Sequence, residues 1–174
     1  DRLLVGAPKS GTGGEAFVYA RSNGSWSLQG TALTATTPLA GDRFGTSVDV
    51  SGENLVVGAA EATVGSAAKG GTAYVFTSDS GTWSRKARLD LGAEAAARDF
   101  FGTSVAIDGE RIVVGAPGRD HNFGAAPGQA GVQADSGEAF AFSLKNGQWI
   151  LETSLDPLFG ADARSGDQTG YSVA

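Results

Sequence analysis

The chain of 174 residues contains no cysteine and no methionine, and its one histidine is His121. The absence of cysteine excludes disulfides, thiolate metal sites and cysteine nucleophiles. A single histidine cannot build a two-histidine metal site, and a catalytic triad would rest on that one residue. The sequence also lacks any run of 18 apolar residues, which a membrane-spanning helix requires. We therefore expect neither thiol chemistry nor membrane insertion.

Charge is also scarce, since charged residues make up 18% of the chain, and 13 basic residues face 19 acidic ones. The net charge of −6 argues against a nucleic-acid partner, because such proteins need cations to neutralise phosphates. Hydrophobic residues, at 41%, suffice for a core. Glycine, at 27 residues, is about twice as frequent as usual, and we expect it in turns and tightly packed strands.

Three short segments recur along the chain. The first segment is found at 44–48 and 101–105 and more weakly at 170–173, the second at 3–8, 55–59 and 112–117, and the third at 16–19, 73–76 and 139–142. A tryptophan follows each copy of the third segment, at Trp26, Trp83 and Trp149. Several landmarks at one spacing of about 57 residues indicate an internally repeated fold.

The repeated unit predicts four short strands, which in the second unit span 46–51, 55–59, 73–77 and 83–89. Glycine-containing turns such as Ser51-Gly52 can close neighbouring strands into antiparallel hairpins. No segment has helical periodicity. The prediction is an all-β fold of β-propeller blades, each with four antiparallel strands, with about three blades' worth in this chain. A β-sandwich is the alternative, but it does not require a strict repeat.

The sequence Phe-Gly-Thr-Ser-Val at 44–48 and 101–105, followed by Val-Val-Gly-Ala, resembles the FG-GAP repeat. This repeat is the blade unit of integrin α-chain propellers and of many bacterial surface proteins, and the bacterial form is the more similar. The resemblance implies a propeller that lies outside the cytoplasm, at the cell surface, secreted or periplasmic, and that serves recognition or adhesion.

The predicted repeats span 1–43, with three strands, then 44–100 and 101–168, and 169–174 begins one more first strand. Three blades are too few for the usual closed propeller, and the terminal blades would have unpaired edges. Two explanations stay open. The favoured one is that further blades belong to the same parent chain, and the other is that copies assemble, for example two in a six-bladed ring.

Calcium is the one cofactor for which the sequence offers candidates. Integrin-type repeats carry a calcium loop between their first two strands, but here 50–54 and 107–111 are only short turns. Because calcium takes six to eight oxygen ligands, such turns cannot hold it. The remaining candidates, in the long loop of the third repeat, are Asp120, Asn122 and Asp135. A solvated loop without calcium is the favoured interpretation.

Several repeated residues are expected to be architectural. Asp42, Asp99 and Asp167 recur just before the Phe-Gly position, where their carboxylates can accept hydrogen bonds from the backbone N–H groups that follow. We expect Phe44, Phe101, Trp26, Trp83 and Trp149 to pack between blades rather than to form a sugar platform. Thr169 stands where the third repeat should have phenylalanine.

The sequence favours a non-catalytic extracellular module that binds a protein or carbohydrate ligand at the cell surface. The candidate binding residues are in the longest loop, which combines charge, a titratable ring and an aromatic side chain: Arg119, Asp120, His121, Asn122 and Phe123. The segment 6–12 resembles a phosphate-binding loop but lacks the lysine before Thr12. Two alternatives remain, the propeller domain of a polysaccharide-active lyase or hydrolase, and a structural component of a surface assembly.

Overall fold

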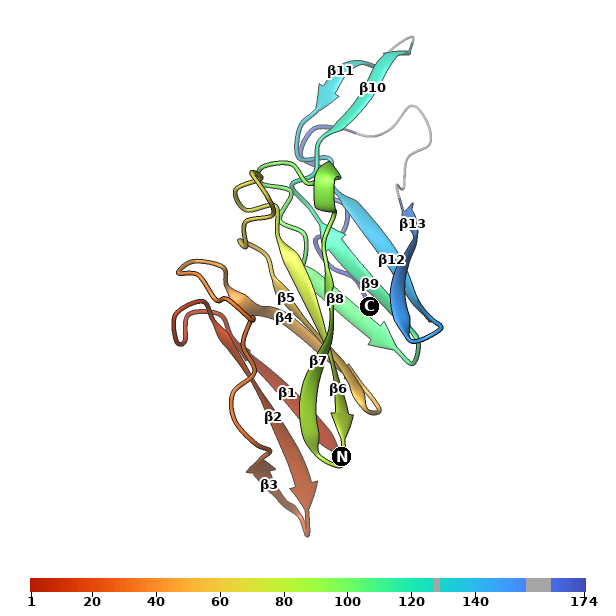
Figure 1. The fold of residues 1–174 in the computed structure, drawn as a ribbon. Helices are drawn as coiled ribbons and strands as arrows, with labels where there is room; N and C mark the ends of the chain where they lie inside the picture. The colour runs from red at the N-terminus through yellow and green to blue at the C-terminus, as the bar shows by residue number, and fades with distance from the viewer. Residues whose placement is uncertain (127–128, 156–163) are drawn as a thin grey trace.

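The computed structural model describes residues 1–126, 129–155 and 164–174, and the side chains of all of these except residues 121–133. Three antiparallel sheets, which we call blades 1 to 3, follow one another along the chain (Figure 1). Blade 1 contains β1 (Arg2–Ala7), β2 (Glu15–Ser22) and β3 (Ser25–Leu28). Blade 2 contains β4 (Phe44–Ser51), β5 (Asn54–Ala59), β6 (Thr72–Asp79) and β7 (Thr82–Leu89). Blade 3 contains β8 (Ser104–Asp108), β9 (Arg111–Ala116), β12 (Glu138–Lys145) and β13 (Gln148–Leu155).

The strands of each blade pair in sequence order, apart from the hairpin described next, so the predicted four-stranded antiparallel unit is confirmed. β5 lies inside its sheet and is covered on both faces, which explains its unbroken apolar run from Leu55 to Ala59. A short helical element, the 3-10 turn η1 (Gly92–Glu94), follows blade 2. None of the described residues belongs to a helix that is long and apolar enough to cross a membrane.

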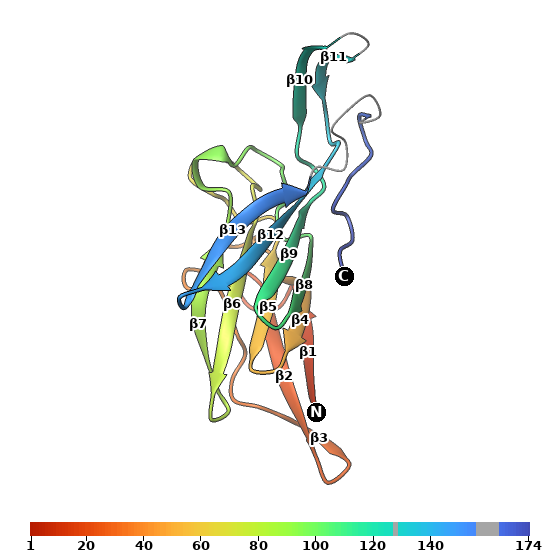
Figure 2. The same ribbon diagram turned by 90° about the vertical axis from the view of Figure 1, so that its right-hand side faces the viewer.

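The long segment between Pro117 and Gly137 is more ordered than the sequence suggested. Where we expected only a loop, β10 (His121–Ala126) and β11 (Gln129–Gln133) pair as an antiparallel hairpin. Figures 1 and 2 show this hairpin standing out from the end of blade 3. Apolar and polar residues do not alternate in this segment, which is rich in small residues. The sequence therefore contained no local indication of strands here.

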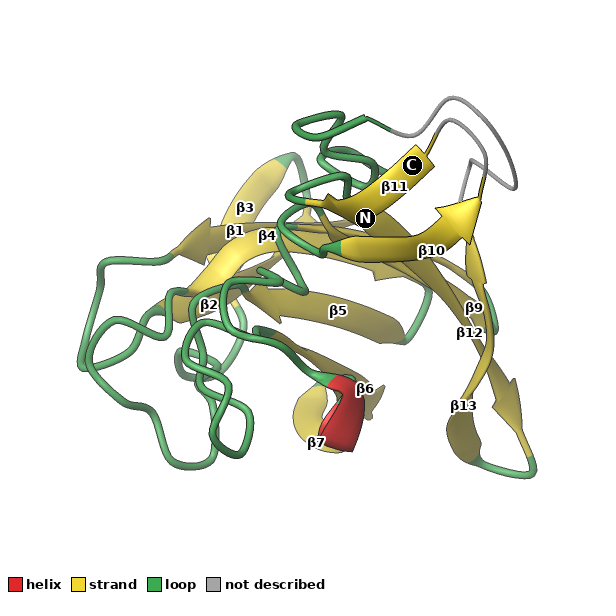
Figure 3. Ribbon diagram, turned by 90° about the horizontal axis from the view of Figure 1, so that it is seen from above, coloured by secondary structure: helices red, strands yellow, loops and turns green. Residues whose placement is uncertain are grey.

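The apolar core lies between the blades. One cluster joins Ala16 and Val18 of blade 1 to residues of blade 2, and a second joins Val56 and Val75 of blade 2 to residues of blade 3. Seen from above, blades 2 and 3 diverge toward their outer strands, β7 and β13 (Figure 3). The wedge between two diverging sheets has most room away from the inner strands, and Tyr74, Phe76 and Trp83 of blade 2 lie there, on β6 and β7. The phenylalanine of each Phe-Gly pair lies instead at the start of the inner strand.

The phenylalanine of each Phe-Gly pair packs in the same way in blades 2 and 3. Phe44 lies 5.5 Å from the Tyr74 ring, and Phe101 lies 5.6 Å from the Phe140 ring, with an interplanar angle of 51° in both pairs. Both phenylalanines are fully buried. The tryptophans differ with their position, because Trp83 and Trp149 pack against the two inter-blade clusters, whereas Trp26 on blade 1 is 46% exposed.

Neighbouring blades approach so closely at their inner strands that only glycine fits. The carbonyl group of Gly102 lies against Gly58, where an added Cβ would be 2.0 Å from the carbonyl oxygen. The Ser47 hydroxyl donates a hydrogen bond of 2.8 Å to the same oxygen. The Ser104 hydroxyl likewise donates to the carbonyl of Gly170, at 2.7 Å. This repeated contact holds each inner strand to the chain segment that enters the next blade.

Candidate functional site

The loops that leave β1, β5 and β9 and the segments that enter the following blade share one end of the molecule, which we call the loop end. Each entering segment contains a residue with left-handed backbone just before the Phe-Gly position. These residues are Arg43 (φ 57°), Phe100 (φ 54°) and Gln168 (φ 53°). The Thr46 and Thr103 hydroxyls donate to the carbonyls of Arg43 and Phe100, at 2.6 and 2.7 Å. The turns that enter blades 2 and 3 are therefore each tied to the start of the inner strand that follows.

An aspartate precedes each of these turns and fixes the segment that leads to it. The carboxylates of Asp42, Asp99 and Asp167 each accept a 2.8 Å hydrogen bond from a backbone N–H three residues earlier, at Leu39, Ala96 and Arg164 respectively. Our expectation that the donors would follow the aspartate was wrong in direction. A separate turn ends at each aspartate, because its backbone N–H donates to the carbonyl of the residue three positions earlier, at 3.1, 3.4 and 3.2 Å, and this turn brings the carboxylate to the N–H of that same residue.

Two hollows open at the loop end, each where a loop of one blade meets the segment entering a blade. The first, of about 280 Å³, is lined by the glycine-rich loop 8–14 together with Gly41, Arg43 and Glu61. The second, of about 250 Å³, lies one blade further along and is lined by Arg98, Phe100, Thr103, Pro117, Gly118, Asp135, Gln168 and Tyr171. Of the three residues with left-handed backbone, Arg43 lines the first hollow, and Phe100 and Gln168 line the second.

The second hollow carries a cation beside an aromatic ring. The Arg98 guanidinium lies 5.9 Å from the centre of the Phe100 ring, a distance at which the two attract each other. Arg98 is exposed and Phe100 is partly buried, so a ligand could contact both. The combination suits a ligand that offers an acidic group next to an apolar surface.

Arg119, the first of the predicted binding residues, is held by contacts within the chain. Its guanidinium donates to the Asp99 carboxylate at 3.0 Å, to the Glu138 carboxylate at 2.9 Å and to the Glu94 carbonyl at 2.9 Å. Its side chain is 19% exposed, and the two carboxylates are 1% and 8% exposed. Because Asp99 and Glu94 precede blade 3 whereas Glu138 begins β12, Arg119 connects the segment entering blade 3 to the interior of that blade.

The other predicted binding and calcium residues surround the base of the hairpin. The Asp120 carboxylate accepts a 2.8 Å hydrogen bond from the backbone N–H of Asp135, so these two residues lie together and close the hairpin. The side chains of His121, Asn122 and Phe123 lie outside the described residues. Among the side chains that the structure describes, no three acidic or histidine residues form a group that could hold a metal ion. Calcium binding and the role of residues 119–123 in binding stay predictions.

Glu61 forms the charged wall of the first hollow. Its carboxylate pairs with Lys69 at 2.7 Å and with Arg43 at 2.5 Å. The hydrogen bond from Lys69, followed by the attraction of the Arg43 charge, outweighs desolvation and lowers the pKa of Glu61 below its usual 4.5. Glu61 is therefore ionised at neutral pH and offsets one of the two positive charges, so the group keeps a net positive charge.

This lowered pKa predicts how Glu61 contributes to stability as the pH changes. A carboxyl whose pKa is lower in the folded state stabilises that state above its ordinary pKa, and the contribution disappears as the pH falls through the lowered value. We expect Glu61→Gln to reduce the free energy of unfolding at pH 7, with a difference from the wild type that disappears as the pH falls through the lowered pKa of Glu61. Urea unfolding at several pH values would measure it. The exposed Glu110→Gln is the control, and a Glu61 effect that stays constant with pH would contradict the assignment.

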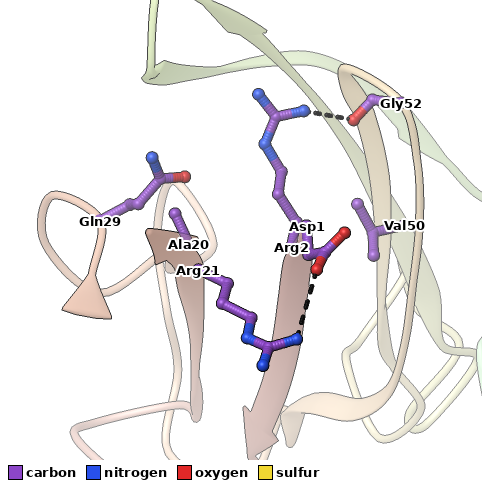
Figure 4. A pocket seen from close by; sticks show the side chains of 7 residues that line it. All are labelled: Asp1, Arg2, Ala20, Arg21, Gln29, Val50 and Gly52. Atoms are coloured by element: carbon purple, nitrogen blue, oxygen red, sulfur yellow. Dashed lines mark hydrogen bonds and ion pairs between the residues drawn. The ribbon is translucent and has the colours of Figure 1, made fainter. Parts of the chain in front are cut away.

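A larger hollow, of about 540 Å³, lies at the opposite end of blades 1 and 2 (Figure 4). Its arginines already have partners. Arg2 donates to the Gly52 carbonyl at 2.6 Å and pairs with Glu53, whose pKa is lowered chiefly by this hydrogen bond. Arg21 forms a long ion pair of 3.7 Å with Asp1. The charges cancel, so this hollow offers less to a charged ligand than the loop end does.

Comparison with known families agrees with the repeated geometry. The model of the FG-GAP repeat matches residues 26–76 and 83–142, which together make up more than half of the chain. The chain therefore belongs to the FG-GAP repeat family. Each matched FG-GAP range begins at the last strand of one blade, β3 or β7, and ends in the third strand of the next, β6 or β12. A comparison with curated proteins finds no match.

Sequence reasoning overlooked the residues that line the loop-end hollows of this FG-GAP protein. One signal was available. The position between the repeated aspartate and the Phe-Gly pair holds arginine, phenylalanine and glutamine in turn, at 43, 100 and 168, while the aspartate beside it never changes. A position that varies among internal copies of one blade is free of architectural constraint. Nothing in a linear pattern, however, says that such a position faces a hollow.

Proposed function

We propose that this FG-GAP protein is a non-catalytic recognition module that works outside the cytoplasm and binds a protein or carbohydrate at its loop end. The proposal rests on the different roles of two neighbouring positions in each copy of the repeat. Asp42, Asp99 and Asp167 make the same backbone hydrogen bond in every copy, whereas the adjacent residues differ in chemistry and line the two hollows. Rigid scaffolds with variable loops are typical of binding proteins.

The strained backbone of these residues supports the same conclusion. A phenylalanine or arginine with left-handed backbone costs free energy that glycine would avoid. Such strain is commonly found at functional positions, where the identity of the side chain matters more than the cost of its backbone. Phe100 and Arg43 have this backbone, and both face solvent-accessible hollows. The projecting hairpin of blade 3 adds contact surface at the same end (Figure 1).

The proposal predicts that binding depends on the hollows. The chain would first be screened on an array of surface glycans and an array of extracellular matrix proteins. A variant combining Arg43→Asn, Arg98→Asn and Phe100→Asn is expected to weaken binding to the best hit by at least about tenfold. Asparagine tolerates left-handed backbone, so the turns should persist. Isothermal titration calorimetry would measure the dissociation constants.

A matched control removes two cations that line neither hollow. Arg21→Asn combined with Lys86→Asn changes two exposed cations on β2 and β7 and should leave the dissociation constant unchanged. Equal losses for both variants would show that binding reflects overall charge, and the absence of a hit on both arrays would contradict the proposal. Circular dichroism would verify that both variants are folded.

A further inference from the structure

We propose that the first hollow of the loop end holds the sulfate or phosphate ester group of an anionic glycan. The inference rests on the proposed function, because it names the chemical class of ligand that one of the two hollows takes. Three features meet in this hollow: a tied glycine-rich loop, backbone N–H groups that have no acceptor, and a surplus of positive charge.

The glycine-rich loop between β1 and β2 forms one side of the hollow. All seven of its residues, 8–14, line it. Two contacts hold the loop together. The Gly14 N–H donates to the Ser10 carbonyl at 2.9 Å, and the Ser10 hydroxyl donates to the Glu15 carboxylate. The loop is therefore fixed before any ligand arrives, which lowers the entropy cost of binding.

The tip of this loop has hydrogen-bond donors that the fold does not use. The N–H groups of Gly11, Thr12 and Gly13 donate to none of the described residues, although those of Ser10 and Gly14 beside them both have acceptors. Gly11 and Thr12 are exposed, so a ligand can approach them. Successive N–H groups of a glycine-rich loop are donors that proteins use for phosphate and similar anions.

Cations from two blades take the place of the lysine that a phosphate-binding loop would carry before Thr12. Lys9 belongs to the loop itself, and Arg43 belongs to the segment that enters blade 2. Both residues line the hollow. The Arg43 carbonyl accepts the Thr46 hydroxyl at 2.6 Å, which fixes the backbone from which the guanidinium extends. The cation that this loop lacks in sequence is thus supplied by the tertiary structure.

The charges around the hollow leave a positive balance. Glu61 is shared between Arg43 and Lys69, so one negative charge faces two positive ones, and Lys9 has no acidic partner among the described residues. The side chains of Arg43 and Lys69 are 42% and 51% exposed, so a ligand can reach both. A tetrahedral ester has several oxygens and can accept hydrogen bonds from guanidinium, ammonium and backbone N–H groups together.

The remaining lining of the hollow favours a glycan over a peptide or a nucleotide. Apart from its charged residues, the described lining consists of glycine, serine, threonine and one proline, with no aromatic or large aliphatic side chain. Bound peptides are commonly anchored by apolar side chains, and nucleotide bases by stacking on aromatic rings. The volume of about 280 Å³ is several times the roughly 30 Å³ that a water molecule takes, so a sugar fits beside its ester group.

The first test uses two matched pairs of probes in isothermal titration calorimetry. One pair is a heparin-derived hexasaccharide and its fully desulfated form, and the other is mannose 6-phosphate and mannose. We expect at least one ester to bind about tenfold or more tightly than its ester-free counterpart, and the better pair identifies the ester. If neither ester exceeds its counterpart, the inference is wrong.

NMR spectra of isotope-labelled protein locate the bound ester. Amide shifts should be largest at Gly11, Thr12 and Gly13, and inorganic sulfate and phosphate should shift the same amides with weaker affinity. Shifts confined to other residues would overturn the site. A free anion that binds as tightly as its ester would overturn the role of the sugar, and a phosphoserine pentapeptide that binds more tightly than both esters would assign the hollow to a protein ligand instead.

Two charge-matched variants separate this hollow from the overall charge of the protein. Glu61→Gln releases Arg43 and Lys69 for the ligand and should tighten binding of the preferred ester about threefold. Glu110→Gln changes the net charge by the same amount at an exposed position outside the hollow and should leave the affinity unchanged. Equal tightening in both variants would show that net charge alone decides the affinity, against the proposed site.

A second pair of variants separates the two hollows. Asparagine tolerates the left-handed backbone of both Arg43 and Arg98. Arg43→Asn should weaken ester binding about tenfold, whereas Arg98→Asn, in the second hollow, should not. An array ligand that needs Arg98 and Phe100 but no ester would overturn this inference and leave the proposed function intact. The absence of any ligand on the arrays would contradict both.

Discussion

Replacement of Arg119 with methionine is expected to lower the free energy of unfolding by about 3–5 kcal/mol. The reason is that methionine would remove the positive charge that pairs with the carboxylates of Asp99 and Glu138. Asp99 and Glu138 are almost completely buried, and Arg119 pairs with both carboxylates. Without the guanidinium, two negative charges would stay close together and largely shielded from water. Urea unfolding followed by tryptophan fluorescence would measure the loss.

The matched control for this variant is Arg2→Met. Arg2 also pairs with a carboxylate at 2.9 Å and donates to a carbonyl, but its partner Glu53 is 58% exposed. Exposed ion pairs contribute little to stability, so this loss should be much the smaller of the two. Arg119→Lys should lie between methionine and the wild type, because an ammonium keeps the charge but cannot match the fork geometry of guanidinium. Equal losses for Arg119→Met and Arg2→Met would show that burial of the carboxylates does not decide the effect.

Replacement of Gly102 with alanine is expected to destabilise the junction of blades 2 and 3 by about 2–5 kcal/mol. Gly102 has φ +89°, which L-residues rarely adopt, and an added Cβ would lie 2.4 Å from the backbone oxygen of Thr72 and 3.3 Å from the nitrogen of Ala59. These atoms belong to the backbone of blade 2, so they cannot move aside as the end of a flexible side chain would. The added methyl group can therefore be accommodated only if blades 2 and 3 move apart.

Gly81→Ala provides the control for the backbone conformation alone. Gly81 has nearly the same φ, +86°, but an added Cβ would have no atom within 4 Å. Its substitution should lower the free energy of unfolding only by the cost of placing alanine in left-handed backbone, about 1–2 kcal/mol. The difference between the two variants, measured by urea unfolding, then reports the crowding between blades. If both variants lose the same stability, the close approach of the blades is not what requires glycine at position 102.

The strands β4 to β7 show how well the repeat predicts secondary structure. The unbroken apolar run of β5, the aromatic and β-branched residues of β6 and the glycine turns are local features, and the predicted ranges 46–51, 55–59, 73–77 and 83–89 all lie within the observed strands. The recurrence of one pattern at a constant spacing indicated that the sheets are blades of one architecture. The FG-GAP assignment followed from the same residues.

The loop end, in contrast, could be predicted only in outline. Its longest loop was recognised from length, but the hairpin β10–β11 closes through backbone pairing that small residues do not encode as a pattern. The sequence also placed Arg119 among ligand-binding residues because it is charged and belongs to that loop. Its actual partners, Asp99 and Glu138, are 20 and 19 residues away in sequence and meet it only after blade 3 has folded.

The sequence by itself determined the strands, their order within each blade and the repeated architecture, because these depend on the two-residue periodicity of strands and on turns between neighbours. The tertiary structure alone decided which carboxylates Arg119 pairs with and which residues line the hollows at the loop end. Those properties depend on the distance and angle at which whole sheets pack. No short segment of the chain contains that information, because each blade obtains half of its surroundings from the next one.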